Sequence, residues 1–208
     1  MTAPRTTCNL SISLDGFIAG PDQSRADPIG VGGMPLHDWH SDTFDAGNEA
    51  DVIARDDLMQ DRGAVIMGRN MYGPIRGQWD EDWRGWWGAE PPYHSPVFVL
   101  THYEHPPIEM AGGTTFFFVT GGFAAAFDQA KEAASEKGDI RIAGGASTVR
   151  QALQAGAVDE LFLNLIPILL GTGERIFDGV PDPGFRPAEV LHSRHATHIR
   201  YVLDHLAR

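Results

Sequence analysis

The sequence has little cysteine, no long apolar run and few basic residues, and each shortage excludes a class of protein. Its single cysteine, Cys8, cannot form an internal disulfide framework and is typical of a reducing compartment. No apolar stretch reaches the roughly 18 residues of a membrane-spanning helix. The N-terminal residues also lack an apolar run long enough for a signal peptide. We therefore expect a cytoplasmic protein.

The charge balance disfavours polyanionic partners. Lysine and arginine number 16 against 28 acidic residues, a formal net charge of −12. Nucleic acids and anionic membrane surfaces require basic patches, so we expect neither as a partner. An anionic small molecule could still bind through a local cluster of donors and cations. With 208 residues and 42% hydrophobic content, the chain suits a single domain, 1–208, with a sizeable core.

Strand-like and helix-like patterns alternate along the chain. We expect strands at 5–14, 63–69, 96–101, 114–120, 139–143 and 159–166, and helices at 42–63, 121–138 and 146–155. Ser41 or Asp42 could cap the first helix. Residues 24–42 read as a long ordered loop, and 188–205 as an edge strand or an antiparallel hairpin. The alternation predicts an α/β domain with a mostly parallel sheet, helices on both faces and an antiparallel C-terminal edge.

A glycine pair follows one predicted strand in "IAGGAS", residues 142–147. Gly144 and Gly145 lie between the strand and the start of the next helix. Free amides at a helix N-terminus attract an anion, and glycine lets a ligand approach the backbone closely. The motif is not the dinucleotide fingerprint GxGxxG. By itself it therefore fits a phosphate site and a plain turn about equally well.

Two further strand ends carry groups suited to a phosphate. One buried strand ends at Gly68 and is followed by Arg69, and another ends in Thr101 and His102. A guanidinium can bind phosphate in a bidentate manner, and open parallel sheets bind ligands beyond the carboxyl ends of their strands. Considered alone, Arg69 is better explained as a surface arginine paired with an acid. Together, the three strand ends favour a phosphate-binding site.

These segments, in this order, resemble the dihydrofolate-reductase-like superfamily, specifically the reductase domain of bacterial riboflavin biosynthesis and its relatives. The resemblance extends over nearly the whole chain. The segments most specific to this family are "SISLDGFIAGPD" and "IAGGASTVRQALQAGAVDEL". The segments "VIMGRNMYG", "VFVLT" and "LIPILLGTGERIF" support the resemblance. It implies a three-layer dihydrofolate-reductase-like fold, NADPH as cofactor, and a homodimer.

The resemblance also implies roles for individual residues. The residues that match the pyrophosphate site of NADPH are Gly144, Gly145, Ala146, Ser147 and Thr148. Arg69 directly follows the strand end at Gly68. Together with Thr101 and His102, it matches the site of the adenosine 2′-phosphate. The backbone near Ile18 and Ala19 matches the segment that meets the nicotinamide carboxamide.

Two departures from the riboflavin reductases bear on the substrate. Those enzymes carry an acidic residue directly before the glycine pair, used on their sugar-phosphate substrate, where this chain has Ala143. After the second strand they have a threonine and paired aspartates, where this chain reads "NMYGP". We therefore expect a different substrate.

Catalytic candidates are few. Dihydrofolate reductases proper place a carboxylate on the first helix beneath the pteridine, and Asp45, Glu49 and Asp51 are the candidates here. Glu49 is our choice, and a solvated helix face is the alternative for all three. Asp15, in "SLDG", is a turn former or, alternatively, a substrate-binding group. Trp39 and His40 could form a wall for a planar substrate, with burial in the core as the alternative.

Other aromatic and metal-ligating residues favour structural roles. Trp79, Trp83, Trp86 and Trp87 are expected to pack a loop onto the body, with a lid or dimer contact as alternatives. His192, His195 and His198 are spaced by three. On a strand His195 would face opposite to the other two, so no metal site is predicted. Cys8 is expected to be an inert core residue.

Together, these expectations predict that the protein is an NADPH-dependent reductase. Hydride would pass to a C=N or C=O carbon of a small planar or heterocyclic substrate, with the cofactor carrying the chemistry. One alternative is a reductase of the riboflavin pathway or of pterins. The other is a catalytically silent module that senses NADPH.

Overall fold

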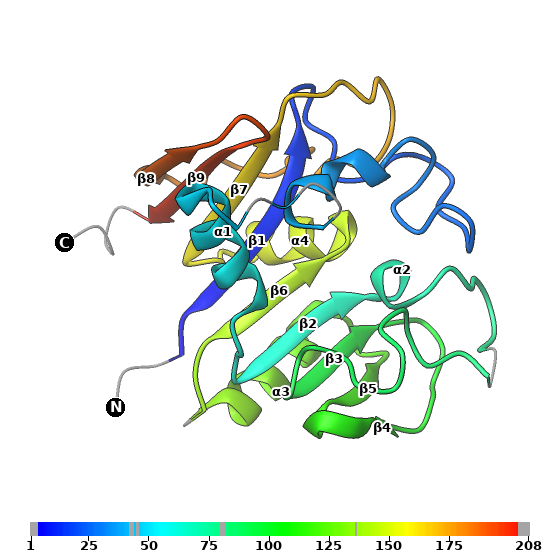
Figure 1. Ribbon diagram of the computed structural model, residues 1–208. Helices are drawn as coiled ribbons and strands as arrows, with labels where there is room; N and C mark the ends of the chain where they lie inside the picture. The colour runs from blue at the N-terminus through cyan, green and yellow to red at the C-terminus, as the bar shows by residue number, and fades with distance from the viewer. Residues whose placement is uncertain (1–3, 42–43, 45, 80–81, 136, 204–208) are drawn as a thin grey trace.

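The central feature of the computed structural model is a nine-stranded sheet (Figure 1), formed within the part of the chain that the structure describes, residues 4–41, 44, 46–79, 82–135 and 137–203. The strand order is β4-β5-β3-β2-β6-β1-β7-β9-β8. The strands are β1 (Thr6–Ser13), β2 (Ala64–Gly68), β3 (Pro96–Leu100), β4 (Ile108–Glu109), β5 (Thr115–Val119), β6 (Ile140–Gly144), β7 (Glu160–Ile166), β8 (Phe185–His192) and β9 (Thr197–Leu203).

The middle of the sheet is parallel and its two edges are antiparallel. β1 pairs with β6 and β7, β2 with β3 and β6, and β3 with β5, all in parallel. β4 is antiparallel to β5 at one edge, and β7, β9 and β8 are successively antiparallel at the other. The expected antiparallel C-terminal edge is confirmed, in the form of the β8–β9 hairpin. Because the parallel strands share a direction, their carboxyl ends meet at one edge of the sheet.

Helices cover both faces, as predicted. α3 (Gly122–Ala134) and α4 (Ala146–Gln154) lie behind the sheet in Figure 1, and α1 (Glu49–Met59) lies in front of it. The main core forms between α3, α4 and one face of the strands, where Phe123, Ala126 and Val149 pack against Ile66 and Ile142. The predicted mixed α/β architecture, a mostly parallel sheet with helices on both faces, is therefore confirmed.

On the opposite face, loops and short helices share the covering with α1. Leu36 and Trp39, in the 3-10 helices η1 (Met34–Leu36) and η2 (Asp38–His40), pack with Ala54 of α1 against Phe162. Farther along the sheet, Tyr72 of the short helix α2 (Arg69–Tyr72) and tryptophans of the 74–95 loop cover β2, β3 and β5. Loop side chains thus replace a helix over this part of the sheet.

The first helix starts later than predicted. Asn48 is its N-cap, accepting hydrogen bonds from the Ala50 and Asp51 amides at 3.1 and 3.3 Å. Ser41, one of the two predicted caps, instead ends η2, and Asp42, the other, lies outside the described residues. An amide side chain caps a helix as well as a hydroxyl or carboxylate does.

Within the described ranges, no helix is both long and apolar enough to cross a membrane.

Candidate functional site

A cavity of about 830 Å³ lies at the carboxyl ends of the parallel strands. Among the residues that line it are all eleven that the resemblance assigns to the cofactor: Ile18, Ala19, Gly68, Arg69, Thr101, His102, Gly144, Gly145, Ala146, Ser147 and Thr148. They come from the ends of three strands, β2, β3 and β6, and from the loop after β1. The fold therefore gathers into one cavity residues that are up to 130 positions apart in the sequence.

The glycine pair connects β6 to α4 at the floor of this cavity. Gly144 has φ +130°, a conformation that L side chains rarely adopt, and Gly145 is the N-cap of α4 and has no side chain to cap it. The amide of Thr148 donates to the Gly145 carbonyl at 3.0 Å, so the amides of Ala146 and Ser147 precede the helical hydrogen bonds. This arrangement offers backbone donors and the positive end of a helix dipole.

Arg69 begins α2 directly after β2. Its guanidinium stacks on the Trp79 ring at 3.7 Å, and its Nη2 donates to the Gln78 carbonyl at 3.3 Å. Its Nε and Nη1 are shielded from solvent and have no hydrogen-bond partner among the described residues. Burial lowers the pKa of Arg69, yet an arginine keeps its charge at neutral pH. A stacked cation with two unused donors is thus fixed at the cavity wall.

Thr101 and His102 follow β3, the strand next to β2. The Thr101 hydroxyl accepts a hydrogen bond from the Tyr103 amide at 3.1 Å, which closes a tight turn, and His102 is exposed. On the other side of the cavity, Ile18 and Ala19 are held by Glu174. The Ile18 amide donates to the Glu174 carbonyl, and the Glu174 amide donates to the Ala19 carbonyl, both at 2.9 Å. This bridge leaves the Ile18 carbonyl and the Ala19 amide for other contacts.

The half of the cavity next to β1 and β7 is lined by neutral polar groups. Asn9 and Ser11 of β1, Asn164 of β7 and the imidazoles of His37 and His40 line it, with Leu58 of α1 as an apolar wall. The two imidazoles hydrogen-bond to each other, with His37 Nδ1 3.0 Å from His40 Nε2. Burial lowers the pKa of His37 to about 4 and lowers that of His40 as well. Both rings are therefore neutral at pH 7.

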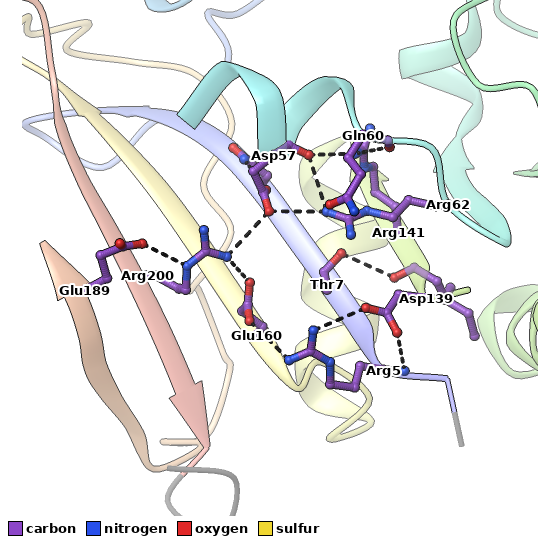
Figure 2. Close-up of polar contacts among 12 residues, drawn as sticks. Arg5, Thr7, Asp57, Gln60, Arg62, Asp139, Arg141, Glu160, Glu189 and Arg200 are labelled. Carbon is purple, nitrogen blue, oxygen red and sulfur yellow. Dashed lines mark hydrogen bonds and ion pairs between the residues drawn. The ribbon is translucent and has the colours of Figure 1, made fainter. Parts of the chain in front are cut away.

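A buried chain of hydrogen bonds runs beneath this half. Asn9 Nδ2 donates to Asp57 Oδ2, Asn164 Nδ2 donates to Asn9 Oδ1, and His198 Nδ1 lies next to Asn164 Oδ1, each at 2.7 Å. Figure 2 shows Asp57 between arginines, with Arg62 and Arg200 at 3.3 and 3.4 Å from its Oδ1. The oxygens of Asp57 accept all of these hydrogen bonds. Its acceptor role fixes the direction of every other bond in the chain.

The catalytic candidates proposed from the sequence lie outside the cavity. Glu49 is exposed and is not among the residues that line it. Asp15 accepts hydrogen bonds from the Ser13 hydroxyl and from the amides of Leu170 and Gly171, so it joins two loops. The Ser13 bond and these amides lower the pKa of Asp15 to about 2. The geometry of Asp15 is that of a turn former.

The first-helix carboxylates do not share one solvated face. Asp51 is fully buried and lies 3.0 Å from His198, so the solvated-face reading is wrong for this residue. It belongs to the buried turn of α1 that faces β9. Asp45 lies outside the described residues.

Trp39 and His40 are separated by the fold. His40 lines the cavity, whereas Trp39 is 1% exposed and its indole donates to the Ser11 hydroxyl at 2.9 Å. Trp39 thus supports the cavity from behind, as part of the core. Cys8 is buried as expected, and burial raises the pKa of its thiol to about 12, which leaves it inert.

The remaining aromatic and histidine groups have mainly structural surroundings. Trp79 packs against Tyr72 and Phe118, and Trp87 against Tyr93 and Phe116, although Trp86 and Trp87 also line the cavity. His195 lies in the turn between β8 and β9 and not on a strand, so the predicted orientation opposite His192 and His198 is wrong. The described residues hold no group of three or more histidine, cysteine or acidic side chains that could bind a metal.

The neutral polar lining was missed from the sequence. Asn9, Ser11 and Asn164 lie within central strands of the sheet, in "TTCNLSIS" and "ELFLNLI". Polar side chains in the middle of central strands must be satisfied by buried partners or by a ligand. That is the signal that could have identified them.

Three solved structures have the same fold. A protein assigned to riboflavin biosynthesis from Shewanella sp. PV-4 is 22% identical, with a TM-score of 0.63 over 95% of this chain and 98% of that one. A diaminohydroxyphosphoribosylaminopyrimidine deaminase/5-amino-6-(5-phosphoribosylamino)uracil reductase from Thermotoga maritima is 15% identical, with a TM-score of 0.56 over 97% and 57%. Dihydrofolate reductase from Enterococcus faecalis, complexed with NADP(H) and RAB-propyl, is 13% identical, with a TM-score of 0.54 over 96% of both chains.

A comparison with curated protein sequences gives no match. The model of one protein family, the RibD C-terminal domain, matches residues 4–199. This match extends from β1 to the start of β9 and includes every residue of the cavity described above. The chain belongs to the RibD C-terminal domain family.

Proposed function

We propose that this protein is an NADPH-dependent reductase that transfers a hydride to a C=N or C=O carbon of a small planar or heterocyclic substrate. One observation carries the proposal: a single cavity joins the amide-rich start of α4, the unused donors of Arg69 and a neutral polar half. The first two suit the phosphates of a dinucleotide and the third suits an organic substrate. The family is one of reductases, which supports an enzyme.

The residues present fit NADPH by their chemistry. The amides of Ala146 and Ser147 would hold the pyrophosphate, because they precede the hydrogen bonds of α4. Arg69 would bind the 2′-phosphate through its guanidinium, with its covered Nε and Nη1 turned toward the ligand, assisted by Thr101 and His102. A Cβ on Gly68 would lie 2.5 Å from Thr148 Oγ1, so glycine keeps the backbone of β2 close to this site. Of these groups, Arg69 would distinguish NADPH from NADH.

The bound cofactor supplies the hydride, and the chain supplies position. The Ile18 carbonyl and Ala19 amide, left open by the bridge to Glu174, are suited to hold a carboxamide. Asn9, Ser11 and the paired imidazoles would orient the substrate beside it. The proton that completes the reduction comes from water or from an acid that we do not assign.

A comparison of melting temperatures with NADPH and NADH tests the proposal. A ligand at a hundred times its dissociation constant stabilises the folded state by about 2.7 kcal/mol, a shift of a few degrees for this size. We expect a larger shift with NADPH than with NADH. No shift with either nucleotide would refute the proposal.

Turnover separates a reductase from a silent NADPH sensor. The placement of Glu49 and Asp15 outside the cavity favours keeping the sensor as a second candidate. A reductase oxidises NADPH in the presence of some member of a panel of carbonyls, imines and pterins. A sensor binds NADPH and oxidises none.

We also propose, from the family resemblance, that the protein is a cytoplasmic homodimer. Light scattering coupled to size-exclusion chromatography tests the oligomeric state. A mass of one 22.7 kDa chain at micromolar concentration would contradict it.

A further inference from the structure

The cations of the cavity lie on one side of it. Three charged side chains line the cavity within the described ranges: Arg69, Arg76 and Glu174. Both arginines follow β2, on the side suited to the cofactor. β6 separates β2 from β1 in the sheet, so the half next to β1 and β7 is on the other side of the glycine pair. Glu174, which bridges to Ala19, adds a negative charge near that half.

Nearby arginines outside the lining are occupied. Arg55 of α1 lies over the Phe44 ring at 4.1 Å, and Arg175 lies over the Phe17 ring at 4.0 Å. Arg62 and Arg200 bind Asp57, at 3.3 and 3.4 Å, beneath the amide chain. None of these lines the cavity. An anionic group bound beside β1 would therefore lose its hydration without contacting a cation of the lining, which is unfavourable; the Arg55 charge reaches His40 only from outside the lining.

The imidazoles of this half do not replace the missing cations. His37 and His40 share a hydrogen bond of 3.0 Å, so one ring nitrogen of the pair carries a proton and the other accepts it. Burial keeps the pKa of each below its ordinary value, and the Arg55 charge further lowers that of His40. Neutral imidazoles bind hydrogen-bonding groups and do not neutralise a phosphate.

The amides of Asn9 and Asn164 have one fixed orientation. The Asp57 carboxylate can only accept, so the Asn9 side chain must turn its Nδ2 toward Asp57. Asn9 Oδ1 then faces Asn164 Nδ2, and Asn164 Oδ1 faces His198. Asn164 Nδ2 also donates to the Leu10 carbonyl at 3.3 Å, which uses both of its hydrogens. Asn9 retains one amide hydrogen, and Ser11 retains its hydroxyl proton because its oxygen accepts from Trp39. The lining thus offers fixed, neutral donors.

We propose that the substrate of this site is an uncharged planar molecule that accepts hydrogen bonds from Asn9 and Ser11 and carries no phosphate or carboxylate. The proposal rests on the proposed reductase function and narrows it. The proposed substrate differs from that of the Thermotoga maritima relative, which is named as a reductase of a phosphoribosylated aminouracil. Ala143 in the cavity lining, between the two halves, agrees with it, because it can neither pair with nor repel a charged group.

Matched probes test the substrate class on NADPH-saturated protein. One set holds uncharged planar carbonyl, imine and heterocyclic compounds, including 3-hydroxybenzaldehyde and uridine. The other set holds their anionic counterparts, including 3-formylphenyl phosphate and uridine 5′-monophosphate. Binding is measured as a further rise in melting temperature and, where reduction follows, as NADPH oxidation. We expect binders among the uncharged compounds only. Binding by the phosphorylated set, or by neither set, would overturn the proposal.

A charge-introducing variant sharpens the test. Leu58→Arg places a guanidinium on the α1 wall of the cavity, whereas Met59→Arg adds the same charge at the next position, which is 46% exposed and outside the cavity. We expect Leu58→Arg to improve the affinity for the phosphorylated probes about tenfold, the effect of one charge-assisted hydrogen bond, and Met59→Arg to leave it unchanged. If Leu58→Arg and Met59→Arg change the affinity for the phosphorylated probes equally, the α1 wall of the cavity does not contact the substrate.

The NADPH titration separates the two possible failures. If NADPH raises the melting temperature and phosphorylated probes then bind, the substrate class is wrong and the reductase proposal stands. If NADPH has no effect, the reductase proposal itself fails.

Discussion

His198 Nε2 lies 3.0 Å from Asp51 Oδ1, and both side chains are fully buried between α1 and β9. The other ring nitrogen, Nδ1, must carry a hydrogen, because it lies 2.7 Å from Asn164 Oδ1, which can only accept. A single proton therefore lies between Nε2 and the carboxyl group. The pair is neutral overall in either arrangement of that proton, which allows it to be buried.

Asp51→Ala and Asp51→Asn should differ in stability. Alanine leaves His198 Nε2 buried without a partner, which costs about 2 kcal/mol. Asparagine can donate its amide hydrogen to Nε2 and keep the direction of the chain, so we expect a much smaller loss. Urea unfolding of both variants at pH 7 measures the difference. Equal free energies of unfolding would show that the pair contributes no specific hydrogen bond.

The same variants should affect the site through Asn164. Since the His198 ring holds Asn164 Oδ1 in place at 2.7 Å, and Asp51→Ala releases that ring, the variant should weaken substrate binding more than NADPH binding. KM for the best substrate should rise, and the melting shift caused by NADPH should stay unchanged. A loss of both in parallel would indicate general unfolding and not a positioning effect.

Acid should destabilise the protein below about pH 6.5. In the unfolded chain His37 titrates near 6.5, whereas burial lowers its pKa to about 4 in the folded protein. Between these values the unfolded state binds more protons, so the free energy of unfolding rises with pH. We expect His37 to contribute a loss of about 1 kcal/mol per pH unit below 6.5.

Single substitutions test whether His37 causes the loss of stability in acid. His37→Gln should reduce the pH dependence of stability between pH 7 and pH 5, measured by urea unfolding. His192→Gln, at an exposed position at the end of β8, should leave it unchanged. An identical slope in both variants would mean that other groups dominate acid unfolding.

Periodicity predicted the central part of the fold because the sheet strands have distinctive patterns. β2 and β3 are covered on both faces and have short apolar runs, β6 has an alternating pattern, and α3 shows the helical spacing of Phe123, Ala126 and Ala130. β4 and α2 were not predicted, because elements of two and four residues are too short for a period. The start of α1 was misplaced, because the capping residue Asn48 lies in a polar segment without a repeating pattern.

The two halves of the site differed in how far the sequence could predict them. The cofactor half lies at strand ends with glycine, arginine and threonine, which local sequence reveals. The substrate half depends on pairs such as Asn9 with Asn164, which are 155 positions apart and meet only because β1 and β7 are neighbours in the sheet. Asp51 read as a surface carboxylate because its partner, His198, is 147 positions away.

Arg69→Ala should remove most of the preference for NADPH over NADH. The ratio of the two dissociation constants should fall about tenfold or more, the value of a charge-assisted contact to the 2′-phosphate. Because Arg69 also stacks on Trp79 at 3.7 Å, the loop could loosen, but this would affect both nucleotides equally. Arg69→Lys keeps the charge and should retain part of the preference. An unchanged ratio in Arg69→Ala would limit Arg69 to its packing against the tryptophan.

Gly68→Ala tests the close approach of β2 to α4. The added methyl would lie 2.5 Å from Thr148 Oγ1, and this contact must be relieved by moving the threonine or the strand end. We expect a loss of stability of about 1–3 kcal/mol. Replacing Thr148 by alanine removes the clashing atom, so the double variant Gly68→Ala/Thr148→Ala should be more stable than Gly68→Ala alone. Additive losses in this double-mutant cycle would show that the two residues do not contact each other and that the tight packing beneath the proposed pyrophosphate site is absent.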